Sequence, residues 1–209
     1  ADLDPIIAAA LPIAAGTAWQ ALERGGVGRG HRVLVIGASG GVGTFSVQLA
    51  ALRGAEVWAL CGERNRGLVE RLGAARSFDY REVQPGSPEL GDARFDAVID
   101  IAGTAPLRSL QALVRDGGSI VLVSGEGGRI LGPVGRIVGA SIRSIGSKRP
   151  LRPLAAVAKA EVLTELVELA ASGALVPVIE RTYPFGEARA ALAHIDAGHA
   201  VGKVVVTAA

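Results

Sequence analysis

A glycine-rich stretch early in the chain, VLVIGASGGVG at residues 33–43, has the residue types that bind phosphate groups. A turn from a strand into a helix directs free backbone N–H groups and the positive end of the helix dipole at an anion. Ala38, Gly40 and Gly43 fit the spacing A-x-G-x-x-G, and Ser39 adds a hydroxyl donor. In such a motif the middle glycine admits the phosphate and the last lets helix and strand pack closely. The stretch predicts a dinucleotide site, although glycine-rich turns also occur for packing alone.

The segment CGERNR should lie beside the ribose of such a dinucleotide. An acidic residue at this point binds the ribose 2′-hydroxyl and indicates NAD, whereas an arginine accommodates a 2′-phosphate and indicates NADP. Glu63 and Arg64 are adjacent, so the rule permits both. We favour Arg64, because a strand that ends at Cys61 places the small Gly62 nearest the ribose and leaves room for a phosphate. Arg66 is a candidate to assist Arg64 in binding the phosphate. The competing interpretation is that Glu63, Arg64 and Arg66 are simply the solvated start of a helix.

Short apolar runs rich in β-branched residues recur between residues 32 and 125. They are RVLVIG, EVWALC, RSFDY, FDAVIDIAG and SIVLVSG. Nearly continuous hydrophobicity is typical of strands that are buried on both faces of a sheet. Amphipathic segments at 44–54 and 65–74 separate the first three runs, with Gly54 and Gly73 placed as C-terminal caps. The alternation predicts an α/β fold: a Rossmann-type doubly wound parallel sheet of about six strands, with helices on both faces.

The flanking segments are predicted from the same periodicities. A helical pattern covers residues 4–23, and Pro12 should divide it into two short helices. After Gly125 the pattern loosens, and we expect a short helix and a sixth strand near Ile142. Residues 153–173 predict a strong helix. The tail offers the run LVPVIE, then a helix in GEARAALAHIDAG and a final strand in GKVVVTA.

Composition excludes several classes of protein. No apolar run in the 209 residues approaches the roughly 18 to 20 residues of a membrane span, and no cleavable leader is recognisable at the start. The net charge is only +2 and aromatic residues are scarce, which argues against a nucleic-acid partner. The single Cys61 excludes an internal disulfide and a cysteine-clustered metal site, and it fits a reducing cytoplasm.

Taken together, the motifs resemble a known family along essentially the whole chain. RVLVIGASGGVGTFSVQLA, CGERNRGLVERLGA, FDAVIDIAG and RTYPFGEARAALAHIDAGHAVGKVVV resemble the zinc-independent quinone-oxidoreductase branch of the medium-chain dehydrogenase/reductase superfamily. The resemblance implies a Rossmann domain that binds NADPH across the carboxyl ends of its strands.

The resemblance also implies which residues contact the coenzyme. Around the pyrophosphate, the adenosine and the nicotinamide riboside these are Ala38, Ser39, Gly40, Gly41, Val42, Gly43, Gly62, Arg64, Asn65, Tyr80, Ala102, Gly103, Ser124 and Gly125. Many relatives have serine at the position of Gly62, and this departure weakens the assignment of NADP. Ala102 and Gly103 equally fit ordinary turn chemistry at the end of a strand.

Members of the family begin with a GroES-like catalytic domain, and this chain starts where that domain ends. We therefore expect a Rossmann domain with its lead-in helix at residues 1–175. Residues 176–209 should form a segment that in relatives returns to the catalytic domain, so that its final strand lacks its usual partners. We accordingly expect the chain to be an engineered portion, a proteolytic core or a truncated product of a longer gene.

The implied chemistry is hydride transfer from NADPH to a small electrophile such as a quinone, an enone or an aldehyde. The junction ALPIAAGTAW contains no metal ligand, so the implied reaction is metal-free. No catalytic acid is identified: His31, His194 and His199 are expected at the surface, and Cys61 in a buried strand is a poor nucleophile. Thr17 fits a place near the nicotinamide as well as a cap or core contact.

Two other functions remain open. One is a non-catalytic module that binds NADP as a sensor or contacts a partner, since a fold does not dictate a function. The other is a zinc-type alcohol dehydrogenase whose metal ligands all lie outside this chain. For the assembly, we expect a homodimer formed through the edge of the sheet, with ASIRSIGS as the edge strand, because an apolar edge is otherwise prone to aggregate.

Overall fold

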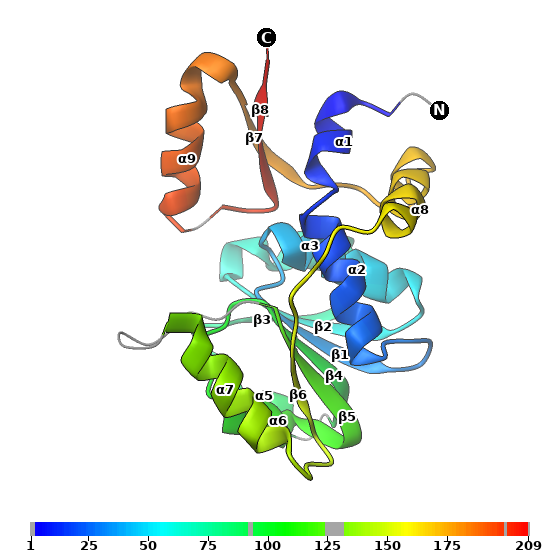
Figure 1. Ribbon diagram of the computed structural model, residues 1–209, viewed down its shortest axis with the longest axis vertical. Helices are drawn as coiled ribbons and strands as arrows, with labels where there is room; N and C mark the ends of the chain where they lie inside the picture. Colours follow the sequence, from blue (N-terminus) through cyan, green and yellow to red (C-terminus); the bar gives the residue numbers. More distant parts are fainter. Residues whose placement is uncertain (1–2, 92–93, 124–131, 199, 209) are drawn as a thin grey trace.

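A six-stranded parallel sheet forms the centre of the molecule (Figure 1). The structure, a computed structural model, describes residues 3–91, 94–123, 132–198 and 200–208, with only the backbone at 132–137. The strands lie in the order β3-β2-β1-β4-β5-β6. Their bounds are β1 Arg32–Ile36, β2 Glu56–Cys61, β3 Ala74–Asp79, β4 Phe95–Asp100, β5 Val114–Leu122 and β6 Leu151–Pro153. Because the order reverses between β1 and β4, the crevice where such sheets bind ligands opens at the carboxyl ends of these two strands.

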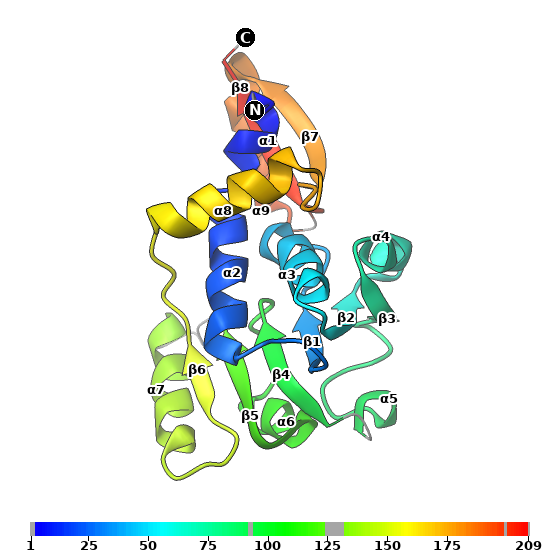
Figure 2. The same cartoon turned by 90° about the vertical axis from the view of Figure 1, so that its right-hand side faces the viewer.

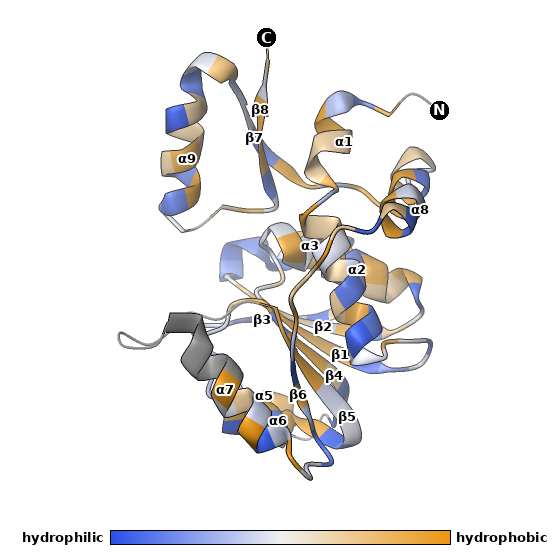
Figure 3. Cartoon of the chain, in the orientation of Figure 1, coloured by the Kyte–Doolittle hydropathy of each residue, from blue (hydrophilic) through white to orange (hydrophobic). Residues whose placement is uncertain are grey.

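Helices cover both faces of the sheet, as the sequence predicts. Alternate residues of each strand point to opposite faces, so that Val33 and Val35 pack in one core whereas Leu34 and Ile36 pack in the other. The first core is covered by α2 Ala14–Gly25, α3 Gly41–Leu52, α4 Arg66–Arg71 and α8 Ala160–Ala171. The second is covered by α5 Pro88–Gly91, α6 Leu107–Leu113 and α7 Gly132–Ser144. Figure 3 shows the hydrophobic colouring concentrated on the strands between these layers.

A second, two-stranded parallel sheet lies beyond the carboxyl ends of the first (Figures 1 and 2). It consists of β7 Ile179–Pro184 and β8 Lys203–Thr207, joined by the turn η2 Phe185–Glu187 and by α9 Ala188–Asp196. We call residues 178–207 the C-terminal unit. Helix α1 Pro5–Ala10 packs beside β8, so both ends of the chain lie on this side of the molecule.

The start of the chain confirms the predicted pair of short helices. The Asp4 side chain accepts a hydrogen bond of 2.7 Å from the Ile6 N–H and thereby caps α1. The chain then bends at Pro12 before α2 begins. Gly54 and Gly73, predicted as C-terminal caps, follow α3 and α4 with φ of 78° and 112°. No helix in the described part of the chain combines the length and the hydrophobicity needed to cross a membrane.

Two predicted elements are wrong. The run ASIRSIGS, predicted as an edge strand with Ile142 in it, lies mostly in α7. The edge strand is instead β6, whose Leu151 pairs with Ile120 of β5. The predicted helix at 153–173 begins only at Ala160, because the residues before it leave β6 and run beside α2, where both backbone groups of Val157 bond to the Gln20 side chain.

Candidate functional site

The turn after β1 lies where the ends of three strands meet. The Gly37 and Ala38 N–H groups both donate to the Leu60 carbonyl oxygen, each at 3.0 Å. On the other side, the Ile101 N–H donates to the Ile36 carbonyl oxygen, also at 3.0 Å. Gly37 has a φ of +84°, which favours glycine, and the turn therefore bends sharply at this residue. The bend carries the chain over the switch point between β1 and β4.

The first turn of α3 presents free donors at this point. Gly40 is the N-cap, and the first intrahelical bond runs from the Thr44 N–H to its carbonyl oxygen at 3.0 Å. The N–H groups of residues 41–43 precede that bond, so the helix itself offers them no acceptor. A Cβ atom added to Gly40 would meet only the Gly37 carbonyl oxygen, at 3.6 Å. Among the described residues, packing therefore does not require glycine at position 40.

Two other positions of the motif are fixed by packing instead. Ala38 is fully buried and belongs to the first core, so its methyl group does not face the open side of the turn. A Cβ atom on Gly43 would lie 2.1 Å from the Gly37 carbonyl oxygen and 2.7 Å from the Ala38 carbonyl group. The last glycine is therefore what allows α3 to approach the turn. Ala38, in the first position of the motif, contributes its methyl group to the first core.

The residues predicted for the adenosine end lie in mutual contact. The Asn65 side-chain amide donates to the Ser39 hydroxyl at 3.2 Å, which joins the turn η1 Glu63–Asn65 to the turn after β1. The Asn65 N–H also donates to the Gly62 carbonyl oxygen at 2.8 Å. The Tyr80 ring lies 3.6 Å from the place of a Cβ atom on Gly62, and it is 45% exposed. A partly open aromatic face thus flanks the predicted ribose position.

The charged residues of this segment differ in what engages them. Arg66 forms an ion pair with Glu63 at 3.1 Å, and its Nε donates to the Ser77 hydroxyl at 3.1 Å. These contacts join Arg66 to η1 and to β3. Arg64 is exposed, and its charge helps to lower the pKa of Glu180 in the C-terminal unit.

Ala102 and Gly103 follow β4 next to the same turn. A Cβ atom on Gly37 would lie 3.3 Å from the Ala102 nitrogen, so the two turns are in close contact. The Gly103 N–H donates to a carboxylate oxygen of the fully buried Asp100 at 3.0 Å. Sequence analysis missed Asp100, although an acid inside the apolar run FDAVIDIAG was a visible signal. Ser124 and Gly125 lie outside the described residues.

The remaining candidate residues lie away from this site or have other partners. The His194 ring nitrogen lies 3.0 Å from a Glu180 carboxylate oxygen, and His31 precedes β1; His199 is outside the described residues. Burial raises the pKa of the Cys61 thiol to about 11, so the thiol stays protonated at neutral pH. Thr17 lies within α2, where its N–H donates to the Ile13 carbonyl oxygen. Among the described residues, no group of three or more His, Cys, Asp or Glu side chains is arranged to hold a metal ion.

A cavity of about 390 Å³ lies elsewhere on the molecule, where the end of α3 meets α4 and the chain after α8. None of the predicted coenzyme residues lines it, and its Gln48 side chain is engaged by both backbone groups of Val176. The chemistry therefore points to the turn after β1 and not to this cavity.

Comparison with known proteins places the chain in a family. The sequence profile described as zinc-binding dehydrogenase matches residues 72–206. This chain belongs to that family. The chloroplast envelope quinone oxidoreductase homolog of Arabidopsis thaliana is 35% identical over 206 residues, covering 95% of this chain and 61% of the relative. The mitochondrial NAD(P)H oxidoreductase RTN4IP1 of Mus musculus is 35% identical over 221 residues, covering 95% of this chain and 54% of the relative.

Solved structures of other proteins share the fold. A quinone oxidoreductase from Coxiella burnetii superimposes with a TM-score of 0.84 at 30% identity, covering 96% of this chain and 60% of that protein. A mycobacterial protein in complex with NADPH superimposes with a TM-score of 0.78 at 25% identity, covering 98% of this chain and 65% of that protein. The chain thus matches the coenzyme-binding part of the medium-chain dehydrogenase/reductase superfamily and spans less than two thirds of these relatives.

Proposed function

We propose that this chain is the coenzyme-binding part of an NADPH-dependent oxidoreductase that reduces a quinone, an enone or an aldehyde. The observation that carries the proposal is the first turn of α3, where the helix offers no acceptor to the N–H groups of residues 41–43 and where, among the described residues, packing does not require glycine at position 40. The relatives named as quinone and NAD(P)H oxidoreductases support the reaction class.

The residues present fit a nicotinamide dinucleotide. The pyrophosphate would bind at the N-terminus of α3, beside the Ser39 hydroxyl. The adenosine would lie along Gly62, Asn65 and the exposed face of Tyr80, and the nicotinamide riboside would extend toward Ala102 and Gly103. These positions follow the carboxyl ends of the strands, where ligands of open α/β sheets bind.

When bound, the coenzyme supplies the hydride, and the chain's own residues bind and orient it. The backbone donors of α3 fix the diphosphate without a side chain. Asp100 holds the turn at Gly103 in place through the Gly103 N–H, which keeps the riboside end ordered. No residue of the described chain is assigned as an acid, and the substrate pocket is proposed to come from the additional length that the relatives possess.

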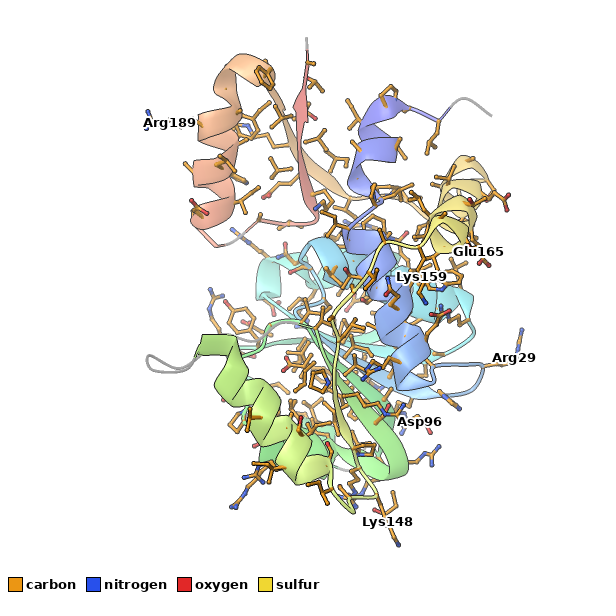
Figure 4. The ribbon with its side chains drawn as sticks, in the orientation of Figure 1. Arg29, Asp96, Lys148, Lys159, Glu165 and Arg189 are labelled. Atoms are coloured by element: carbon orange, nitrogen blue, oxygen red, sulfur yellow. The ribbon has the colours of Figure 1, made fainter. Side chains whose placement is uncertain are left out.

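Arg64→Glu tests the choice of coenzyme. If Arg64 binds the 2′-phosphate, the variant should lose about tenfold or more in affinity for NADPH while its affinity for NADH changes little, since a hydrogen bond to a charged group contributes about 1.5–3 kcal/mol. Titration calorimetry on wild type, R64E and the control R189E gives both dissociation constants. Arg189 lies on α9 and points into solvent (Figure 4), so its variant should behave as wild type.

Two results would count against the proposal. An unchanged ratio of the two affinities in R64E would remove Arg64 from the phosphate site. Absence of binding of either coenzyme to the wild type at millimolar concentration would remove the coenzyme function itself.

The reaction is proposed to be metal-free. The segment of residues 10–19, which leads into α2, carries no Cys, His, Asp or Glu that could bind zinc. The description of the matched family favours the alternative, a zinc-type dehydrogenase whose ligands lie in further domains. Metal analysis of the full-length gene product would distinguish the two: stoichiometric zinc whose removal abolishes activity would establish the alternative.

The assembly and the compartment are also proposals. We propose a homodimer in which the edge of the sheet at β6 and the neighbouring α7 form the contact. We further propose the cytoplasm as the compartment, because a single buried cysteine suits a reducing environment. Two of the relatives carry chloroplast or mitochondrial names, so a fluorescent fusion of the full-length protein is the appropriate measurement.

A further inference from the structure

The C-terminal unit contacts the turn after β1 through the backbone. The Gly202 N–H donates to the Ser39 carbonyl oxygen at 2.9 Å. A Cβ atom on Gly202 would lie 2.3 Å from the Val178 carbonyl oxygen, so only glycine allows this approach. The Val201 N–H donates to a Glu180 carboxylate oxygen at 2.9 Å, and the Lys203 N–H donates to the Val178 carbonyl oxygen at 2.8 Å. Residues 201–203 are therefore fixed in place beside the turn.

This arrangement brings the Lys203 side chain to the first residue of α3. A Cβ atom on Gly41 would lie 3.1 Å from Cδ of Lys203 and 3.7 Å from its Nζ. Lys203 is half-buried, and within the described part of the chain its ammonium group forms no ion pair. The charge thus lies beside Gly41, the first residue of α3.

A positive charge at this position is electrostatically unfavourable in the absence of a ligand. The N-terminus of a helix carries a partial positive charge, which attracts anions and repels cations. No described carboxylate offsets the ammonium group, unlike the Arg66 guanidinium, which Glu63 neutralises. A bound diphosphate would reverse the sign of this interaction, because it would lie between two positive groups.

We propose that Lys203 binds the diphosphate of the coenzyme, from the side of the C-terminal unit and opposite the backbone donors of α3. The inference rests on the proposed function and adds to it a side-chain cation at the diphosphate, whereas the predicted cation, Arg64, is assigned to the 2′-phosphate. The ligand class is a dinucleotide diphosphate. Since NADPH and NADH share this group, Lys203 contributes equally to both, whereas Arg64 distinguishes them.

The test uses Lys203→Gln and Lys203→Met, which both remove the charge; the methionine retains an apolar stem of similar length beside Gly41. Dissociation constants are measured by titration calorimetry for NADPH, NADH, ADP-ribose and adenosine 2′,5′-bisphosphate. The first three contain the diphosphate and the last does not. Lys148→Gln is the matched control, because Lys148 lies at the opposite end of the molecule (Figure 4).

Both Lys203 variants should bind NADPH, NADH and ADP-ribose about tenfold more weakly, since charge-assisted hydrogen bonds are the strong ones. The ratio of the NADPH and NADH affinities should stay at its wild-type value, and affinity for adenosine 2′,5′-bisphosphate should change less. Lys203→Arg should retain most of the affinity. Thermal unfolding without ligand should be unchanged or shifted upward in K203Q, because a repulsive charge has been removed.

The outcomes separate this inference from the proposed function. If the wild type binds coenzyme and both variants bind it equally well, the assignment of Lys203 is wrong and the coenzyme site stands. If the wild type binds no coenzyme, the proposed function is wrong. A uniform loss for all four ligands together with a lowered unfolding temperature would show a structural role and would also overturn the assignment.

Discussion

At the scale of single residues, the turn after β1 shows which glycines serve the fold and which remain available to a ligand. Gly43 is required by the chain itself, because any side chain there would overlap the carbonyl groups of Gly37 and Ala38. The fold does not require glycine at position 40, because the described surroundings leave room for a Cβ atom there. The spacing of the motif predicted both glycines. It could not show that one is needed for packing and the other is available to a ligand, because the residue type is the same at both positions.

Substitutions at Gly40 and Gly43 should therefore fail in different ways. Gly40→Asp places a favoured N-cap residue at the start of α3, so the free energy of unfolding should be maintained. The added carboxylate should nevertheless lower NADPH affinity by more than about tenfold through repulsion of the phosphates. Gly43→Ala should instead destabilise the protein by about 1–3 kcal/mol through overpacking. Urea denaturation and calorimetry measure the two effects.

Gly40→Asn is the control for the aspartate variant, as it has the same shape and also caps a helix well. It should fold normally and lose less affinity than Gly40→Asp. Wild-type NADPH affinity in Gly40→Asp would show that no anion binds above Gly40.

At the scale of elements, α7 shows why sequence patterns near a sheet edge mislead. ASIRSIGS contains β-branched and small residues, as edge strands do. The glycine-rich sequence before it has no clear hydrophobic periodicity. In the structure the Ser144 hydroxyl donates to the Ala140 carbonyl oxygen at 2.8 Å. The same hydroxyl accepts a hydrogen bond from the Leu151 N–H of β6 at 2.9 Å. The helical spacing of the apolar residues was present in the sequence. Deciding between the two interpretations needs the position of β6, which a three-residue strand hardly signals.

The corrected edge leads to a testable prediction about association. Val138, Ile142 and Ile145 are 50%, 65% and 83% exposed, and their spacing places them on one side of α7 and its C-terminal end. If this stripe forms part of the proposed dimer, Ile142→Glu should convert the dimer to a monomer, because a charge would be buried without a partner. Light scattering coupled to gel filtration gives the mass directly.

Arg143→Glu, on the same helix, should leave the dimer intact, since Arg143 is exposed and follows the stripe residue. A monomeric wild type, or a dimer that tolerates Ile142→Glu, would remove α7 from the interface.

At the scale of the whole molecule, the strand order followed from the alternation of strands and helices, which leaves few topologies. The position of the C-terminal unit beside the turn after β1 could not be predicted in this way. Ser39 and Gly202 are far apart in sequence, and no local period reports how a two-stranded unit docks on another sheet. Lys203 was therefore missed, and its only signal was a basic residue at the start of the predicted final strand GKVVVTA.

The opposite end of the sheet contains a carboxylate that ties its strands together. Asp96 on β4 accepts a hydrogen bond of 2.7 Å from the Arg32 N–H of β1, and the Arg115 guanidinium of β5 donates to its other oxygen. Burial pushes the pKa of Asp96 upward, but these hydrogen bonds outweigh it and hold the pKa below its ordinary value. Figure 4 shows Asp96 at this end of the sheet.

The lowered pKa predicts a dependence of stability on pH. A carboxylate whose pKa is lowered by folding stabilises the protein above its unfolded-state pKa, about 3.9, and loses this contribution as the pH falls through the lower folded-state pKa. Asp96→Asn should thus be less stable than wild type at pH 7, and the difference should shrink below about pH 4. Free energies of unfolding from urea titrations between these pH values measure it; a difference that is constant with pH would contradict the ionic role of Asp96.

The bond from Gly202 to Ser39 also has a consequence for how the protein is made. The turn after β1 is synthesised well before Gly202, the residue whose N–H bonds to the Ser39 carbonyl oxygen. A nascent chain that has already formed its central sheet would still hold this turn with one side uncovered. A chain released before residue 202 would thus keep its central core but would lack the contact that completes the turn.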